Sequence, residues 1–256
     1  MMRSEFSISS SIDYPRPASV SVRAVEGVPR WKRLLDIACI LLAMPLLLPL
    51  AALIGVLIKL VSPGPVLFKQ ERIGYRARKF MCLKFRTMHV NSDSSVHRGH
   101  LDQLMRSNQP MVKLDTKGDP RLIRFGLILR STGLDEIPQL INVLRGEMSL
   151  VGPRPCIPYE FDQFLPRHRQ RCGSLPGLTG LWQVSGKNRT TFEQMMDLDI
   201  YYVQNKSLFL DISILLRTIP AILVQVWEVK VLKRPLGNPS PSSLREAAPR
   251  AATAAE

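Results

Sequence analysis

Residues 37–58 form a run of 22 residues without a charged side chain, and two prolines, Pro45 and Pro49, lie in its middle. At a rise of about 1.5 Å per residue, a straight helix of this length reaches roughly 33 Å, enough to cross the ~30 Å hydrocarbon core of a bilayer. Each proline removes a backbone donor and clashes with the preceding turn, so a break is expected in the middle of the run. The run therefore predicts a membrane segment that either crosses the bilayer with a kink or bends back on itself.

Basic residues flank this run on both sides. They are Arg30, Lys32, Arg33, Lys59, Lys69, Arg72, Arg76, Arg78 and Lys79. Because Lys and Arg mark the cytoplasmic side of a membrane segment, both ends are expected to be cytoplasmic. This favours a re-entrant helix over residues 30–61 that dips into the inner leaflet and returns. A single kinked span remains the alternative, since prolines are tolerated in transmembrane helices.

The rest of the chain has room for one modest domain. The 256 residues carry a net charge of +14, which suits the phosphates of a nucleotide, a lipid headgroup or a nucleic acid without choosing among them. Residues 1–29 are rich in serine and lack the apolar core of a secretory signal, and residues 234–256 are mainly Pro, Ser and Ala. We expect two disordered tails around a cytosolic domain at residues 62–230.

Cysteine and histidine spacing indicates no metal site. The four cysteines show no CxxC pattern, and one of them lies in the apolar run, so we expect reduced thiols rather than a zinc site or a disulfide framework. His97 and His100 lie close together in the polar, irregular stretch 89–118. Solvated loop histidines are far commoner than metal ligands, and we assign these two no function.

A β-hairpin is predicted after the membrane segment. Residues 62–65 contain two prolines and a glycine, which signal a turn. The short apolar runs 66–68 and 80–83 follow, separated by a polar stretch around Gly74.

Helical patterns dominate the remainder. Apolar residues at helical spacing predict a helix over 121–130, and a capping-box pattern of Thr190 with Glu193 predicts the start of a helix that runs through Tyr202. The apolar stretch 208–229 is interrupted by charged residues and a proline, which favours a helix at the membrane surface or in the core over a second span.

Two adjacent carboxylates, Asp135 and Glu136, precede another predicted helix. Pro138 suits the first position of that helix, which ends before Gly146. Its apolar face consists of Ile137, Leu140, Ile141 and Leu144. The helix dipole and unpaired backbone N–H groups stabilise anions at this end.

The proximity of the two carboxylates calls for a cation. Adjacent like charges repel, so one carboxyl group takes up a proton unless a cation lies beside the pair. Mg²⁺ suits such a site, because it is usually held by one or two carboxylates together with substrate phosphates. An ionised Asp can also act as a nucleophile. Taken alone, such a pair is most often an electrostatic helix cap.

Cations on restricted backbone strengthen the catalytic interpretation. Lys84 and Arg86 lie in the segment 84–88, and Arg154 stands between two prolines. Such cations fit a diphosphate, since little conformational entropy is lost when the anion binds. We assign them, with Arg72, as candidate phosphate-binding residues. The alternatives are a solvated strand edge for Lys84 and Arg86, and a turn residue paired with a surface acid for Arg154.

A glycine-punctuated loop at 176–183 is the remaining candidate. Gly180, Trp182 and Gln183, with Lys187 further on, could approach a nucleotide base or the headgroup zone. The same loop could be a tight turn whose Trp182 fills the core. The chain has no phosphate-binding loop, dinucleotide fingerprint or nucleophile elbow.

Taken together and in this order, five segments resemble the bacterial monotopic phosphoglycosyl transferases, which start exopolysaccharide, capsule or O-antigen assembly on a polyprenyl phosphate. The segments are residues 64–74, 84–88, 134–140, 148–155 and 176–183. The resemblance implies a mainly helical fold with a small β-hairpin, in which amphipathic interfacial helices and a re-entrant helix broken at Pro45 anchor a compact catalytic domain to the cytoplasmic face of the bacterial inner membrane.

The resemblance also implies a mechanism. Asp135 would attack the β-phosphate of a UDP-sugar, Glu136 would hold Mg²⁺, and UMP would leave before undecaprenyl phosphate takes the phosphosugar. Galactose and glucose are the sugars favoured by resemblance to exopolysaccharide enzymes. The implied partners are the UDP-sugar, the lipid phosphate and the inner leaflet, without nucleic acid; the sequence sets no oligomeric state.

Two positions depart from the family pattern. Gly133 stands where Ser is common, and Lys187 stands where Arg is common, which would lose any bidentate phosphate contact of an Arg. Two other classes of function stay open: a membrane-tethered basic protein that binds nucleic acid or anionic lipid without chemistry, and a single-pass assembly factor. Neither gives a reason for the carboxylate pair or for Arg154 between prolines.

Overall fold

The computed structural model describes residues 27–90, 99, 102–105, 107, 110–111, 121–186 and 189–232, although not the side chains of residues 228–232. Most of both predicted tails lies outside the described residues, as do His97, His100 and Lys187. Within the described ranges the chain is mainly helical with two small two-stranded sheets, which confirms the predicted fold class at that level.

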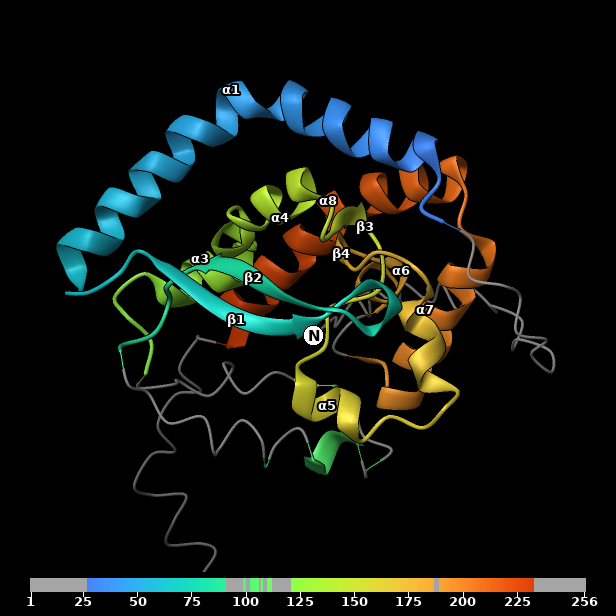
Figure 1. Cartoon of the computed structure of the whole chain (residues 1–256). Coiled ribbons are helices and arrows are strands. Elements are labelled where there is room, and N and C mark those ends of the chain that lie inside the picture. Colours follow the sequence, from blue (N-terminus) through green and yellow to red (C-terminus); the bar gives the residue numbers. More distant parts are fainter. Residues whose placement is uncertain are drawn as a thin grey trace, which may run out of the picture.

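The longest helix, α1 (Arg30–Val61), contains the predicted membrane segment. It remains helical through Pro45 and Pro49 and arches over the rest of the chain (Figure 1), so Pro45 does not interrupt the helix, and a kink at this residue stays a prediction. A proline bends a helix without ending it when the hydrogen bonds on either side persist.

Both ends of α1 pack on the same body. Lys32 and Asp36 are buried near its start, and Ile54 and Ile58 are buried near its end. The exposed apolar side chains between these ends include Leu41, Leu42, Leu46 and Leu48. One face of α1 thus packs on the body, and apolar side chains on its other face are exposed.

The predicted hairpin is confirmed. Strands β1 (Leu67–Ile73) and β2 (Lys79–Phe85) pair antiparallel, and the 3₁₀ turn η1 (Tyr75–Ala77) connects them. Phe85 of β2 packs against Ile54 and Ile58 of α1, because these side chains share one apolar cluster. The hairpin therefore lies under the end of α1.

The remaining elements build the body below the arch (Figure 1). In chain order they are α3 (Gly126–Thr132), η3 (Leu134–Glu136), α4 (Gln139–Arg145), β3 (Ser149–Val151), α5 (Pro158–Asp162), η4 (His168–Gly173), β4 (Gly177–Thr179), α6 (Leu181–Val184), α7 (Phe192–Asn205) and α8 (Leu208–Leu232). Strands β3 and β4 form a parallel pair.

The predicted start of α7 needs correction. The N-cap of α7 is Thr191, boxed with Gln194, rather than Thr190 with Glu193. The Thr190 hydroxyl instead accepts a hydrogen bond from the Trp182 indole at 2.6 Å.

The buried face of α4 differs from the predicted apolar face. Ile141 and Leu144 are exposed, whereas Gln139, Asn142 and Val143 are buried. Side chains that bind backbone groups, rather than apolar contacts alone, therefore attach this helix to the body.

Helix α8 has one buried and one exposed face. Asp211 and Ile214 are buried, and the exposed apolar residues of this helix include Phe209, Leu216, Ile219, Leu223 and Trp227. By length and composition alone, α1 and Leu208–Trp227 are each apolar enough to cross a membrane.

Candidate active site

The carboxylate pair lies in the 3₁₀ turn η3, directly before α4, as the sequence predicts. Gly133 reverses the chain at the end of α3 with φ 76°, a left-handed conformation that glycine adopts without strain. Pro138 is the N-cap of α4 rather than its first residue. Asp135 is only 7% exposed, while the Glu136 side chain is 33% exposed. The adjacent carboxylates thus have different surroundings.

A lysine from the hairpin reaches this pair. Lys84 Nζ donates to Glu136 Oε1 at 2.6 Å, and both side chains are half-buried. Lys84 is therefore not simply a solvated residue at a strand edge, because its ammonium group is paired with Glu136.

Four of the charged candidate residues affect the pKa of the Cys82 thiol on β2. Burial is the main cause that raises its pKa, and Lys84 and Arg72 oppose that shift. Glu136 raises the same pKa and Arg154 lowers it. All four charged side chains thus act on one point in the hairpin.

Arg72 of β1 and Arg154 of the loop at residues 153–155 form a cationic corner. Arg72 Nη1 donates to the Pro155 carbonyl at 3.0 Å, and Arg154 lies 3.6 Å from Glu160 Oε1. Burial lowers the pKa of Arg72, and the repulsion from Arg154 lowers it further. Burial opposes ionisation of Glu160, but the attraction of Arg154 and Arg72 outweighs it and lowers its pKa. Two arginines against one carboxylate leave a net positive charge that suits a diphosphate.

Three supporting residues were missed by sequence reasoning. The buried Arg171 of η4 donates to the Arg154 carbonyl at 2.8 Å and is ion-paired with Asp199 of α7. Glu160 also accepts from the Ile157 backbone N–H at 3.0 Å. Only Glu160 has a local signal, because an acid three residues after a helix N-cap is typical of a capping box. The other two are far apart in sequence.

Arg86 has a different environment from the one predicted. Its guanidinium is buried and donates to the Ser62 carbonyl at 2.8 Å and the Pro63 carbonyl at 2.6 Å. These carbonyls follow the last turn of α1. Arg86 therefore fastens the end of α1 to β2, and its role as a phosphate ligand stays a prediction.

The structure favours the core interpretation of the glycine-rich loop. Trp182 is 5% exposed and belongs to an apolar cluster with Ile73 and Met196. A Cβ at Gly180 would lie 2.2 Å from the Gly152 carbonyl oxygen, so this glycine permits close backbone contact. Gln183 donates to the Leu178 carbonyl at 2.9 Å. The loop thus contains β4 and places Trp182 in the core, and its contacts with a nucleotide stay a prediction.

The donor set fits Mg²⁺ held jointly with a substrate. In the part of the chain that the structure describes, no group of three or more His, Cys, Asp and Glu side chains is placed to hold a metal ion. Glu136 and Asp135 offer adjacent carboxylate oxygens at the site, which are the hard ligands that Mg²⁺ prefers, and Mg²⁺ commonly takes its other ligands from phosphates and water.

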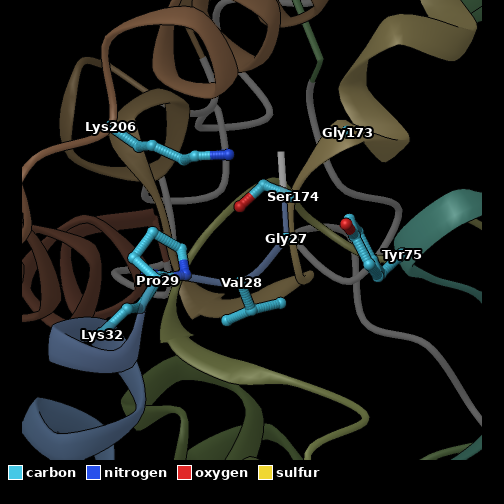
Figure 2. Close-up of a pocket in the computed structure, with 8 residues that line it drawn as sticks. All are labelled: Gly27, Val28, Pro29, Lys32, Tyr75, Gly173, Ser174 and Lys206. Atoms are coloured by element: carbon cyan, nitrogen blue, oxygen red, sulfur yellow. The ribbon is translucent and has the colours of Figure 1, made fainter. Parts of the chain in front are cut away.

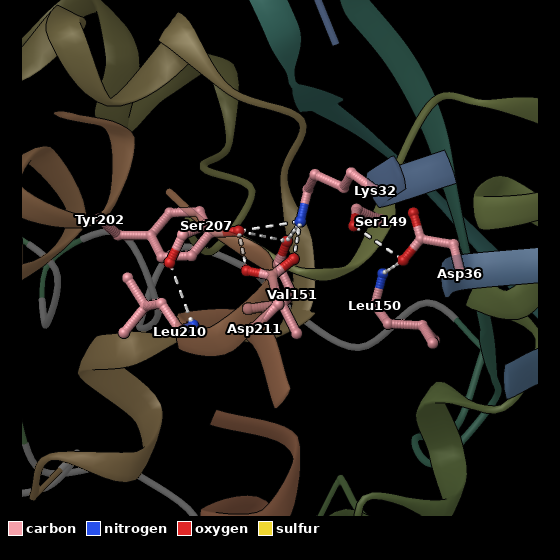
Figure 3. A network of polar contacts seen from close by, with 9 residues as sticks. All are labelled: Lys32, Asp36, Ser149, Leu150, Val151, Tyr202, Ser207, Leu210 and Asp211. Carbon is pink, nitrogen blue, oxygen red and sulfur yellow. Dashed lines mark hydrogen bonds and ion pairs between the residues drawn. The ribbon is translucent and has the colours of Figure 1, made fainter. Parts of the chain in front are cut away.

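A buried polar network anchors the start of α1 (Figure 3). Lys32 Nζ donates to Asp211 Oδ2 at 2.6 Å, to the Tyr202 hydroxyl at 2.8 Å and to the Val151 carbonyl at 2.8 Å. One turn further, Asp36 Oδ1 accepts from the Ser149 hydroxyl at 2.9 Å and from the backbone N–H of the next residue. Helix α1 is thus tied to β3, α7 and α8 together.

A shallow hollow lies beside this anchor. Tyr75, Ser174 and Lys206 surround it with the chain that enters α1 (Figure 2). Its lining includes neither carboxylate of η3, so it is separate from the candidate active site.

Comparison with known proteins identifies the family. The chain belongs to the bacterial sugar transferase family, whose sequence pattern matches residues 28–225. This confirms the resemblance inferred from the five segments.

Several curated relatives are similar over most of this chain. The exopolysaccharide production protein ExoY of Sinorhizobium fredii is 38% identical over 202 residues, which cover 79% of this chain and 88% of that protein. The UDP-glucose:undecaprenyl-phosphate glucose-1-phosphate transferase of Caulobacter vibrioides is 42% identical, over 75% of this chain and 69% of that protein. The undecaprenyl-phosphate galactose phosphotransferase of Salmonella typhimurium is 37% identical, over 75% of this chain and 40% of that protein.

Proposed function

We propose that this protein transfers a sugar 1-phosphate from a UDP-sugar to undecaprenyl phosphate and thereby starts the assembly of an exopolysaccharide or a related glycan. The family match and the activities named for the relatives support this reaction class. The observation that carries the proposal is the buried Asp135 next to Glu136, whose carboxylate is paired with Lys84.

In the first step, an Asp135 carboxylate oxygen attacks the β-phosphorus of the UDP-sugar. A new carboxylate–phosphorus bond forms, the bond between the β-phosphorus and the bridging oxygen breaks, and UMP leaves with that oxygen and its electron pair. Asp135 can attack because its ionised form is the nucleophilic one, and the turn before α4 favours a negative charge.

In the second step, an oxygen of the lipid phosphate attacks the same phosphorus. The bond to Asp135 breaks, the carboxylate is regenerated, and the sugar stays attached through a diphosphate to undecaprenol. Two separate steps allow a soluble nucleotide sugar and a membrane lipid to meet the enzyme one after the other. Ping-pong kinetics are the expected consequence.

The basic residues and the metal would neutralise the negative charge of the substrate diphosphate. Arg72 and Arg154 would hold the diphosphate, while Lys84 orients Glu136. Glu136 would hold Mg²⁺, which when bound supplies positive charge to the transferring phosphoryl group.

The anchoring of α1 supports a re-entrant arrangement on the cytoplasmic face. Lys32 near its start and Ile58 near its end are both buried against the same body. A helix that crossed the bilayer would place these two residues on opposite sides, where one body could not cover both. We therefore propose that the exposed middle of α1 enters the inner leaflet and that α8 lies at the interface.

The names of the relatives indicate several different sugars. Their names include glucose, galactose and N-acetylgalactosamine. We propose galactose or glucose, and a screen of UDP-sugars decides between them.

The test uses the full chain in detergent with Mg²⁺, undecaprenyl phosphate and a panel of UDP-sugars. We expect UMP release with one of them. Without lipid, UDP-sugar labelled at the β-phosphate should label the protein and release at most about one UMP per active site. Asp135→Asn should do neither, while Asp162→Asn, an exposed acid on α5, serves as the matched control.

Two outcomes would overturn this proposal. If no UDP-sugar released UMP while the chain still bound membranes, a binding protein without chemistry would replace the enzyme. Near-normal turnover of Asp135→Asn would replace the covalent route with direct attack by the lipid phosphate.

A further inference from the structure

One edge of β2 is covered by a side chain instead of a strand. In the described part of the chain, β1 is the strand that pairs with β2, and α4 lies along the other side. Asn142 of α4, 0% exposed, accepts a hydrogen bond from the Leu83 backbone N–H at 3.0 Å and donates one to the Met81 carbonyl at 2.8 Å.

This contact has the pattern of a third strand. In a parallel ladder, a residue accepts from the N–H of the residue after its partner and donates to the carbonyl of the residue before it. The Asn142 amide makes both bonds around Cys82, so one side chain supplies the donor and the acceptor that a residue of a paired strand would supply. Asparagine is a poor residue for a helix interior, because its amide competes for backbone hydrogen bonds. Its presence here therefore calls for a specific contact.

Both segments joined by this contact also carry, or directly follow, a residue of the Lys84–Glu136 ion pair. Leu83 immediately precedes Lys84 on β2, and α4 begins three residues after Glu136. The bond from Asn142 therefore links the strand that carries the ammonium group to the helix that follows its carboxylate partner.

The far end of α4 is also fixed. Asn142 Nδ2 additionally donates to Glu147 Oε2 at 2.6 Å. The Arg33 guanidinium of α1 binds the last carbonyls of the helix, those of Val143 and Leu144. Helix α4 thus has little freedom to slide relative to β2.

We propose that Asn142 is a positioning residue that sets the register between β2 and α4 and so holds Lys84 on Glu136. This inference rests on the proposed function, because Lys84 there orients the Glu136 carboxylate that would hold Mg²⁺. Small displacements of a catalytic group lower the rate without loss of binding.

The first test separates the contact from general stability. Asn142→Ala should speed amide hydrogen exchange in the peptide that contains β2, because Leu83 loses its acceptor. Val143→Ala, which removes a fully buried side chain of the same helix from its cluster with Cys82, should lower Tm but speed that exchange less, because the Leu83 N–H keeps its acceptor. Equal exchange in both variants would contradict the proposed contact.

The second test asks whether Asn142 acts through Lys84. With Lys84 present, Asn142→Ala should lower kcat for UMP release by about 10-fold, and more than Val143→Ala. In a Lys84→Met background, measured by single-turnover UMP release, the same change should lower the rate by less than about 2-fold.

The outcomes distinguish this inference from the proposed function. An equal loss in both backgrounds would make Asn142 a stability residue and overturn the inference. Absence of UMP release by the wild-type chain with every UDP-sugar would instead overturn the proposed function.

Discussion

Lys84 on β2 and Glu136 in η3 are 52 residues apart in sequence, yet Lys84 Nζ lies 2.6 Å from Glu136 Oε1. The ion pair joins the hairpin under the membrane helix to the turn that carries the candidate nucleophile. It also places a cation on one of two carboxylates that are neighbours in sequence, and such a cation reduces the repulsion between like charges. A substrate diphosphate with Mg²⁺ would bind at a site that already contains both signs of charge.

Removal of the Glu136 charge should weaken metal dependence. We expect Glu136→Gln to cut UMP release by about 100-fold or more and to raise the Mg²⁺ concentration required for half-maximal rate, because an amide is a weaker Mg²⁺ ligand. Titration of Mg²⁺ against initial rates checks this. Glu71→Gln removes an exposed acid paired with Lys79 and should leave the titration unchanged. Full wild-type activity in excess chelator would remove Glu136 from its metal role.

The topology of α1 can be tested by labelling. Single cysteines at Ser21 and Ser92, in a background without the four native cysteines, should react only with reagents that reach the cytoplasm. Both ends of α1 contact one body, and that body lies on one side of the membrane in our proposal. Labelling of position 21 from the periplasm would show that α1 crosses the bilayer.

The features that sequence predicted well are local ones. The apolar run of α1, the hairpin and the turn before α4 each follow from short patterns of charge, alternation and proline. Pro45 does not interrupt α1, because a proline can bend a helix while the turns on either side of it remain helical.

The features that sequence missed are contacts between distant segments. Charge alone does not reveal that the Arg86 guanidinium binds the carbonyls that follow α1. Arg171 and Asp199, 28 residues apart, carry no local signal of their ion pair. Thr190 fitted a cap pattern as well as Thr191 did, and only the position of Trp182 separates them.

The buried ion pair at the start of α1 should be a major source of stability. Lys32 and Asp211 are each 1% exposed, so Lys32→Met or Asp211→Asn leaves one polar group without its charged partner. We expect each change to lower the free energy of unfolding by about 3–5 kcal/mol. Thermal unfolding in detergent measures this. Lys79→Met, in the exposed pair with Glu71, should cost at most about 1 kcal/mol. A loss that small for Lys32→Met would show that the network does not anchor the helix.

Cys156 provides a pH-dependent probe of the folded state. Burial raises the pKa of its thiol from 9.0 to about 12. At pH 8, roughly one thiol in ten thousand is then ionised, about a thousandfold fewer than for a pKa of 9.0. Alkylation by iodoacetamide, followed by peptide mass spectrometry, should be correspondingly slow in native protein and fast after denaturation.

The same shift predicts a direction for stability. Between pH 9.0 and about 12 the folded state keeps a proton on Cys156 that the unfolded chain has lost. The folded state therefore loses stability as pH rises, by at most about 1.4 kcal/mol per pH unit from this group. Cys156→Ala should make the loss of Tm above pH 9 less steep. An identical pH profile for the variant and the wild type would contradict this cause.

Arg86 distinguishes a structural role from substrate binding. Its two terminal nitrogens bind the carbonyls of Ser62 and Pro63, a fork that a lysine cannot reproduce. We expect Arg86→Lys and Arg86→Leu to lower Tm and to increase protease cleavage between α1 and β1, while KM for the UDP-sugar stays within about 2-fold of wild type. Arg154→Lys should show the opposite pattern, with a raised KM and a smaller loss of Tm, because Arg154 lies in the cationic corner with Arg72. If Arg86→Lys raised KM without lowering Tm, its guanidinium would contact the diphosphate after all, and the end of α1 would need another anchor.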